Sequence, residues 1–180
     1  MTESKWEQSI KEEKIRKCLK NWFRKEGKEV LPEEKALPSM RYEEGNIIPD
    51  IIAYQKRANT VYLIECKQAS KLRYIGHAFG QMLADKLSLT KMRKRELQKK
   101  LQELTGKSDL NTLKLSFGVA FPKQHSDRKE IDRMITMMHQ EEPFKNFAIY
   151  TVDTVNTNVY NSVTRKSRGK LVNYTDLMKP

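Results

Sequence analysis

The stretch Asp50-Ile51-Ile52-Ala53-Tyr54, followed after a polar turn by Val61-Tyr62-Leu63-Ile64-Glu65-Cys66-Lys67, decides the fold. Two runs of β-branched and aromatic residues joined by a short polar segment are typical of a β-hairpin. Because alternate residues of a strand share a face, Glu65 and Lys67 point to one side of the sheet and Cys66 to the other. Apolar residues on both faces are typical of a central strand. The sequence therefore predicts a buried strand whose end carries an acid and an amine.

The segments around this hairpin predict a mixed α/β domain. A helix is expected over residues 4–26, because apolar residues from Ile15 to Phe23 recur at the spacing of one helical face, and Gly27 is expected to end it. The other expected elements are a short edge strand within 28–37, a loop over 38–48, helical structure over 74–104, a strand over 113–121, a helix over 128–140, and strands over 147–152 and 158–163. We expect one domain over 1–180, with a central sheet covered by helices, a basic helical insertion around 90–110 and a C-terminal strand extension.

The chain carries a strong positive charge. Lys and Arg total 35 against 23 Asp and Glu, a formal net charge of +12 over 180 residues. A compact domain with this excess attracts polyanions and releases their counterions on binding. Nucleic acid is therefore the first partner to consider, and an anionic membrane surface is the second. No stretch approaches the roughly 18 apolar residues of a membrane span, so we expect no membrane insertion.

The cysteines and the N-terminus indicate a cytoplasmic protein. Cys18 and Cys66 are too few for a disulfide framework or a cysteine-based zinc site, and free thiols are the ordinary state in a reducing compartment. The first residues, MTESKWEQ, lack the apolar core of a signal peptide.

Asp50, Glu65 and Lys67 form a set suited to phosphodiester hydrolysis. Charge at the end of a buried strand costs desolvation, and a divalent cation between the two carboxylates would offset that cost. Mg²⁺ prefers oxygen ligands and keeps positions for water and phosphate oxygens, and we expect Mn²⁺ to substitute. Lys67 is expected to orient or help deprotonate the attacking water, or to neutralise charge in the transition state. The alternative interpretation is a surface salt bridge at the end of a strand.

The pattern Pro49-Asp50, fourteen residues, then Glu65-Cys66-Lys67 resembles the PD-(D/E)xK nuclease superfamily. The resemblance covers roughly residues 8–122, where a first helix, a hairpin, a second helix and a strand follow in the superfamily's order. It implies a restriction-endonuclease-like core, a central mixed β-sheet flanked by helices. Within the superfamily, the stretch IPDIIAYQKRANTVYLIECKQ is most similar to archaeal Holliday-junction resolvases and related restriction-type nucleases.

The resemblance implies two further residues near the metal. Resolvases carry a metal-facing glutamate on the first helix. Glu12 is the best candidate because it lies three and seven residues before Ile15 and Leu19, on their buried face. A solvated helix charge is the alternative for Glu12. Ser39 lies in the loop where resolvases place a catalytic serine, although its spacing to Asp50 differs by about one residue.

The helix after the motif carries a partial match to the superfamily. Related nucleases place a glutamine there, often as QxxxY, and Gln81 is the expected counterpart. Asp85 stands where the tyrosine would be, and a surface polar residue is the alternative for Gln81. Gly76 and Gly80 are expected to let this helix sit close to the sheet.

Basic side chains after the motif are the expected DNA contacts. Lys71 and Arg73 come soon after Lys67 and are expected to flank the scissile phosphate. The basic helical segment beyond them is expected to contact the phosphate backbone, with a solvated helix face as the alternative. The members of that segment are Lys86, Lys91, Arg93, Lys94, Arg95, Lys99 and Lys100.

The sequence thus predicts a Mg²⁺-dependent DNA endonuclease. Its expected catalytic residues are Asp50, Glu65, Lys67, Glu12 and Gln81, and its expected metal ligands are Asp50, Glu65 and Glu12. A homodimer is expected because cutting both strands of a duplex usually needs two sites, with residues 131–138 or the last strands as the interface. Two alternatives remain open: a nuclease-like fold that only binds nucleic acid, and an RNA-directed nuclease.

Overall fold

Helices and strands follow one another as expected of a mixed α/β domain. The computed structural model describes residues 5–32, 49–68, 72–91, 94–123, 128–142, 144–160 and 171–177. The helices are α1 (Lys5–Lys25), α3 (Leu72–Lys91), α4 (Lys94–Thr105), α5 (Arg128–Gln140) and α6 (Tyr174–Leu177), with a short 3-10 helix η1 (Phe144–Asn146). The strands are β1 (Glu29–Val30), β2 (Ile51–Gln55), β3 (Thr60–Cys66), β4 (Lys114–Pro122), β5 (Ala148–Asp153), β6 (Asn158–Tyr160) and β7 (Val172–Asn173).

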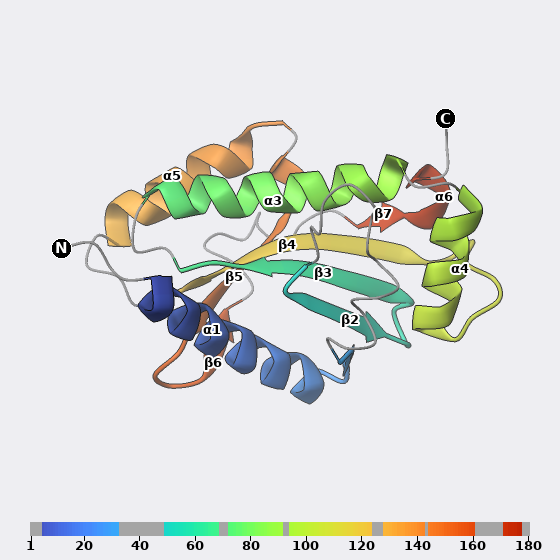
Figure 1. Cartoon of the computed structure of the whole chain (residues 1–180), viewed down its shortest axis with the longest axis horizontal. Coiled ribbons are helices and arrows are strands. Elements are labelled where there is room, and N and C mark those ends of the chain that lie inside the picture. The colour runs from blue at the N-terminus through green and yellow to red at the C-terminus, as the bar shows by residue number, and fades with distance from the viewer. Residues whose placement is uncertain are drawn as a thin grey trace.

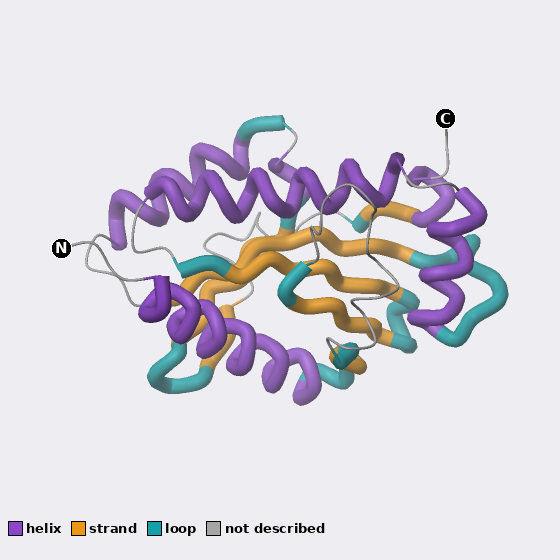
Figure 2. The backbone as a smooth tube through the Cα atoms, in the orientation of Figure 1, coloured by secondary structure: helices purple, strands orange, loops and turns teal. Residues whose placement is uncertain are grey.

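One mixed sheet runs through the centre of the molecule. Six strands lie in the order β1-β2-β3-β4-β5-β6, and β7 pairs with β4 outside this path. β2 and β3 form the predicted antiparallel hairpin, while β3, β4 and β5 run parallel to one another. β1 and β6 add antiparallel strands at the two ends of the path. Figure 2 shows the strands as one curled layer between helices. The predicted fold class, α/β with a central mixed sheet flanked by helices, is confirmed.

Side-chain alternation along β3 divides the apolar core into two clusters. Val61 and Leu63 pack into the cluster that α3, α4 and α5 share with the sheet. Ile64 and Cys66 pack on the opposite face, in the cluster that contains the apolar residues of α1. α3 and α5 lie together over one face of the sheet, and α1 covers the other (Figure 1). β3 is therefore a central strand with apolar side chains on both faces, as the sequence predicted.

The end of α1 is fixed by Gly27, as predicted. Gly27 has a φ of 73°, in the left-handed region that glycine adopts at little cost. Its N–H donates to the carbonyl of Arg24, and the N–H of Lys28 donates to the carbonyl of Phe23. These two bonds form a Schellman motif, which satisfies carbonyl groups that the helix end would otherwise leave unpaired.

The helical structure predicted after the hairpin is confirmed with one division, and the role predicted for its two glycines is wrong. The helical structure predicted over 74–104 is divided into α3 and α4, and α4 runs in a different direction (Figure 1). The change of direction lets Leu97 and Leu101 of α4 enter the core cluster on the α3 side. Gly76 and Gly80 do not serve close packing, because a Cβ atom added at either position would meet nothing within 4 Å. Both glycines lie away from the contact between α3 and the sheet.

Some predicted segments fall outside the described residues. They include the loop over 38–48 with Ser39, and the part of the last predicted strand beyond Tyr160. The edge strand predicted within 28–37 is β1, at the end of the sheet path. None of the helices described is both long and apolar enough to cross a membrane.

Candidate active site

The hairpin brings Asp50 and Glu65 to adjacent positions. Ile51 lies opposite Ile64 in the register of β2 and β3, so the next pair along the hairpin is Asp50 and Glu65. Alternation along β3 directs Glu65 to the α3 side, because Ile64 belongs to the cluster on the α1 side. Asp50 directly precedes β2, and its carboxylate lies within reach of Arg16 from α1. The Asp50 carboxylate is anchored across the hairpin by a 2.8 Å hydrogen bond from the backbone N–H of Cys66.

Lys67 and Arg16 connect helix α1 to the two carboxylates. The Lys67 Nζ lies 3.2 Å from Oε1 of Glu65 and 3.5 Å from Oε2 of Glu12. Arg16, one helical turn after Glu12, places its Nη1 3.5 Å from Oδ1 of Asp50. The structure thus brings Glu12 to the Asp50, Glu65 and Lys67 motif. Arg16 was missed at the sequence level, although its i+4 spacing from Glu12 puts both residues on one face of the helix.

Burial and mutual repulsion set the charges of this cluster. Glu65 is 2% exposed, and burial followed by repulsion from Asp50 raises its pKa to about 8, although the Lys67 ammonium opposes the shift. Burial alone would lower the pKa of Lys67, but the carboxylates of Glu65, Glu12 and Asp50 outweigh burial and raise it. Lys67 is therefore a protonated donor at neutral pH, and the arrangement disfavours its predicted role in deprotonating water.

Asp85 of α3 belongs to the same cluster, and the sequence interpretation gave it no role. Its side chain is 3% exposed, and neither carboxylate oxygen has a hydrogen-bond partner. Burial and repulsion from Asp50 raise its pKa to about 7. The signal that could have found Asp85 is its position in the apolar stripe of α3, three residues after Met82 and four before Leu89. A lone acid in such a stripe is buried by the same packing that buries its neighbours.

Two glutamine side chains add further unpaired polar atoms. The predicted site residue Gln81 is half-buried, and its Oε1 has no hydrogen-bond partner. Gln68, directly after Lys67, is 1% exposed, and both its Oε1 and its Nε2 lack partners. Buried polar atoms are normally paired, because leaving one unpaired costs about 1–3 kcal/mol.

The donor atoms fit a hard divalent cation. Carboxylate and amide oxygens are the ligands that Mg²⁺ and Mn²⁺ accept, and Asp50, Glu65, Asp85 and Gln81 supply them. Within the described part of the chain, no three His, Cys, Asp or Glu side chains already stand as a coordination group. The Asp50 carboxylate is held by Arg16 and by a backbone N–H, and that of Glu65 by Lys67. A cation would have to compete with these internal partners.

Comparisons with known proteins assign the chain to no family. No protein-family model matches it, and neither a curated protein nor a solved structure does. The candidate active site therefore depends on the geometry of its own residues.

The predicted DNA contacts lie at two different ends of the sheet. Arg73 is exposed in the first turn of α3, shortly after Lys67, and its guanidinium lies 5.0 Å from the ring centre of Tyr74. Arg95 is exposed on α4 at the opposite end of the sheet (Figure 1). That end is where β4 begins, opposite Thr60 of β3 rather than Glu65.

The remaining basic residues divide between those that can and cannot be placed. Lys71 and Arg93 lie outside the described residues, as do the side chains of Lys91 and Lys94. Lys86 is half-buried, with its Nζ 5.7 Å from the ring centre of Phe117. Burial lowers the pKa of Lys86, so this member of the basic segment packs against the core rather than presenting its charge to DNA.

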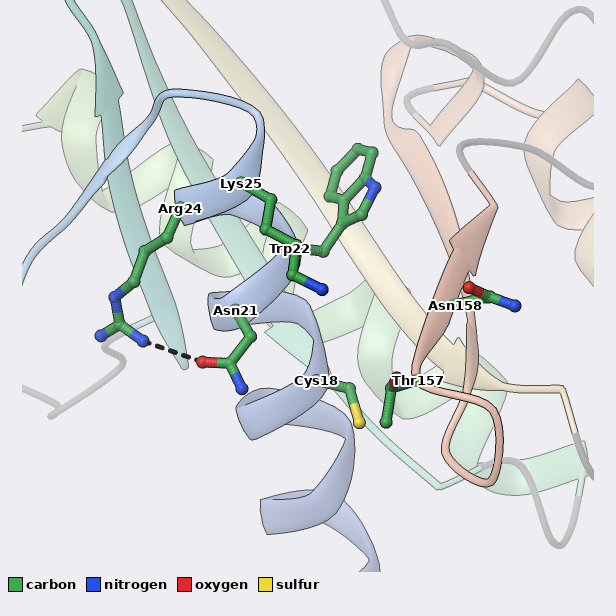
Figure 3. Close-up of a pocket in the computed structure, with 7 residues that line it drawn as sticks. All are labelled: Cys18, Asn21, Trp22, Arg24, Lys25, Thr157 and Asn158. Atoms are coloured by element: carbon green, nitrogen blue, oxygen red, sulfur yellow. Dashed lines mark hydrogen bonds between the residues drawn. The ribbon is translucent and has the colours of Figure 1, made fainter.

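A surface pocket lies beside α1 (Figure 3), and none of the residues that line it belongs to the carboxylate cluster. It has a volume of about 410 Å³ and lies between the C-terminal half of α1 and the turn that joins β5 to β6. The residues that line it are Cys18, Asn21, Trp22, Arg24, Lys25, Thr157 and Asn158. None of these described lining residues is an acid, and Arg24 is turned toward Asn21, to which it donates a hydrogen bond of 3.1 Å. The pocket and the carboxylate cluster therefore have no residue in common.

Proposed function

We propose that the chain is a Mg²⁺-dependent DNA endonuclease of the PD-(D/E)xK type. The main support is one arrangement: the hairpin and α1 bring Asp50, Glu65, Lys67 and Glu12 to one end of the central strand. The net charge of +12 supports a polyanionic substrate, since phosphate contacts dominate the affinity of proteins for DNA. The proposed substrate is duplex or branched DNA.

Each residue of the cluster has a task in this proposal. Asp50 and Glu65 would hold the metal, which would polarise the scissile phosphate and activate water as a Lewis acid. Lys67, held protonated by its carboxylate neighbours, would donate to a phosphate oxygen and neutralise the charge that develops there. Glu12 would position the Lys67 ammonium through their ion pair, and Arg16 would fix the orientation of Asp50.

The proposal is tested by incubating supercoiled plasmid, linear duplex, single strands, a four-way junction and an RNA duplex with the protein and Mg²⁺. Asp50→Ala and Lys67→Ala are each expected to reduce cleavage by about 100- to 1000-fold, the usual loss when a charge-stabilising group is removed. Glu13→Ala, an exposed neighbour of Glu12 on α1, is the matched control and should cleave like the wild type. Wild-type protein that leaves every substrate intact would contradict the proposal. Variants that cleave at the wild-type rate would contradict the assignment of residues.

A second candidate, a nucleic-acid-binding module without catalysis, is favoured by the internal ion pairs. Lys67 bridges Glu65 and Glu12, and Arg16 pairs with Asp50, so the cations of the chain itself partly neutralise the cluster. Such a module should bind DNA equally well in Mg²⁺ and in EDTA and should show no cleavage. Titration of a labelled duplex under both conditions separates the module from the nuclease.

We also propose that the nuclease acts as a homodimer, since a two-fold axis matches the symmetry of duplex DNA. Met137 is 60% exposed on α5, within the segment predicted as an interface. Light scattering on the purified chain gives its mass, and a monomer at micromolar concentration would contradict the homodimer. Met137→Lys should shift a dimer toward monomer.

A further inference from the structure

Asp85 lies where the packing of α3 calls for an apolar residue. Ile75, Phe79, Met82 and Leu89 form the buried stripe of this helix, and Asp85 continues it at helical spacing. The stripe faces the side of the sheet on which Glu65 projects. The Asp85 carboxylate is thus enclosed between helix and sheet at 3% exposure, with both oxygens unpaired.

A second buried aspartate shows what a purely structural carboxylate looks like in this protein. Asp153 is 1% exposed and accepts hydrogen bonds from the N–H groups of Val155 and Asn156, at 3.1 and 2.9 Å. It also accepts from the Asn156 Nδ2 at 3.0 Å and pairs with the Lys123 Nζ at 3.3 Å. Asp85 has none of these compensations, so stabilisation of the fold does not account for its presence.

Asp85 is one of three carboxylates whose charges act on one another. Repulsion from Asp50 acts on Asp85, and repulsion from Asp85 acts on Glu65, so the three carboxylates share one region of negative potential. Gln81, one turn before Asp85 on α3, adds an amide oxygen without a donor. Buried carboxylates that repel one another are stabilised together by a divalent cation.

Lys67 determines on which side of Glu65 a cation can sit. Its ammonium lies between Glu65 and Glu12, 3.2 and 3.5 Å from their oxygens, on the side of α1. A divalent cation at the same place would meet the ammonium charge. On the α3 side, Asp85 and Gln81 supply three buried oxygen atoms without hydrogen-bond partners.

We propose that Asp85 is a direct ligand of the divalent cation, which is held between α3 and the hairpin by Asp85, Glu65 and Asp50. Glu12, in this arrangement, is a positioning residue for Lys67 and does not bind the metal. The inference rests on the proposed function in that both require a divalent cation at this cluster.

The test is Mn²⁺ binding to the full chain, measured by isothermal titration and by electron paramagnetic resonance of free Mn²⁺. Asp85→Asn and Asp50→Asn should each weaken Mn²⁺ binding by at least about tenfold, since even residues that only support metal ligands cost that much. Glu12→Gln and the control Glu13→Gln should bind Mn²⁺ like the wild type. Because Asp85→Asn removes an unpaired buried charge, its melting temperature in EDTA should equal or exceed that of the wild type, which guards against loss of the fold.

The outcomes separate this inference from the proposed function. Loss of Mn²⁺ binding in Asp50→Asn with full binding in Asp85→Asn overturns the role of Asp85 and leaves the nuclease proposal standing. If Glu12→Gln binds Mn²⁺ more weakly than Asp85→Asn does, the role of Asp85 is also overturned, because the cation then lies on the α1 side. A wild-type chain that binds no Mn²⁺ overturns both.

Discussion

Asp153 closes the turn between β5 and β6, and its replacement should destabilise the protein. Asp153→Ala removes the acceptor of two backbone N–H groups and the ion-pair partner of Lys123. We expect the free energy of unfolding to fall by roughly 2–3 kcal/mol, as for hydrogen bonds to charged groups. Asp109→Ala is the control, because Asp109 accepts one N–H bond in an exposed turn. Urea denaturation measures the free energy of unfolding of both variants. An equal decrease in the two would contradict the idea that the burial of Asp153 makes its hydrogen bonds more stabilising.

The buried carboxylates Asp85 and Glu65 should make the metal-free protein less stable at alkaline pH. The pKa of Asp85 is raised from 3.8 to about 7 and that of Glu65 from 4.5 to about 8. The folded state therefore holds these two protons more tightly than the unfolded state. Their stabilising contribution is complete below the unfolded pKa values and is lost as the pH rises through 7 and 8.

We accordingly expect the melting temperature in EDTA to fall between about pH 5.5 and about pH 8.5. The double variant Glu65→Gln, Asp85→Asn should show a flatter dependence, because neither amide titrates. Thermal melts followed by circular dichroism measure both proteins. If the melting temperature falls with pH equally steeply in both proteins, groups other than Glu65 and Asp85 control its pH dependence.

The sequence predicted the residues of the cluster that follow from local periodicity and left out those that follow from tertiary packing. Strand alternation placed Glu65 and Lys67 on one face, and the helical face of α1 placed Glu12 toward the sheet. Arg16 and Asp85 were missed, since their roles depend on which elements pack together. Their spacing from Glu12 and from the apolar stripe of α3 is readable in the sequence, but that these helix faces meet the hairpin follows only from the packing of α1 and α3.

At the scale of elements, a glycine is required by close packing in β4 but not in α3. Gly118 lies between Ile64 of β3 and Ala148 of β5, and an added Cβ would come within 2.9 Å of the Ala148 carbonyl oxygen. Gly118→Ala should therefore destabilise the protein by roughly 1–3 kcal/mol, as overpacking usually does. Gly80→Ala meets nothing within 4 Å in the interior of α3 and should stabilise by roughly 0.5–1 kcal/mol. Chemical denaturation of both variants tests whether their stabilities change in opposite directions. A Gly118→Ala variant more stable than the wild type would contradict the close packing of β3, β4 and β5.

The elements that were predicted correctly are those with a strong local pattern. The hairpin, β4 and α5 carry clear alternation or helical spacing, and the structure has them close to the predicted residues. The division between α3 and α4 was missed because Leu89, Leu97 and Leu101 keep a helical spacing across it. The change of direction brings Leu97 and Leu101 of α4 into the same core cluster as α3.

On the scale of the whole molecule, the positive charge is not concentrated on one helix. Arg73 lies in the first turn of α3, at the end of the sheet where β3 ends, whereas Arg95 lies on α4 at the other end of the sheet. A nuclease must hold the scissile phosphate at its carboxylates, so basic residues near them contribute contacts in every productive complex. Distant basic residues contribute only if the DNA extends along the full length of the sheet.

This difference predicts unequal effects of two matched substitutions on DNA binding. Arg73→Ala and Arg95→Ala each remove one exposed guanidinium, so both lower the net charge from +12 to +11. Loss of one phosphate contact should reduce the slope of log K against log salt by about 1, and we expect this for Arg73→Ala but not for Arg95→Ala. Fluorescence anisotropy of a labelled duplex over a range of salt concentrations, with Ca²⁺ in place of Mg²⁺ to limit cleavage, gives both slopes. An equal change in both variants would mean that DNA reaches α4, and a change in Arg95→Ala alone would move the binding surface away from the carboxylates.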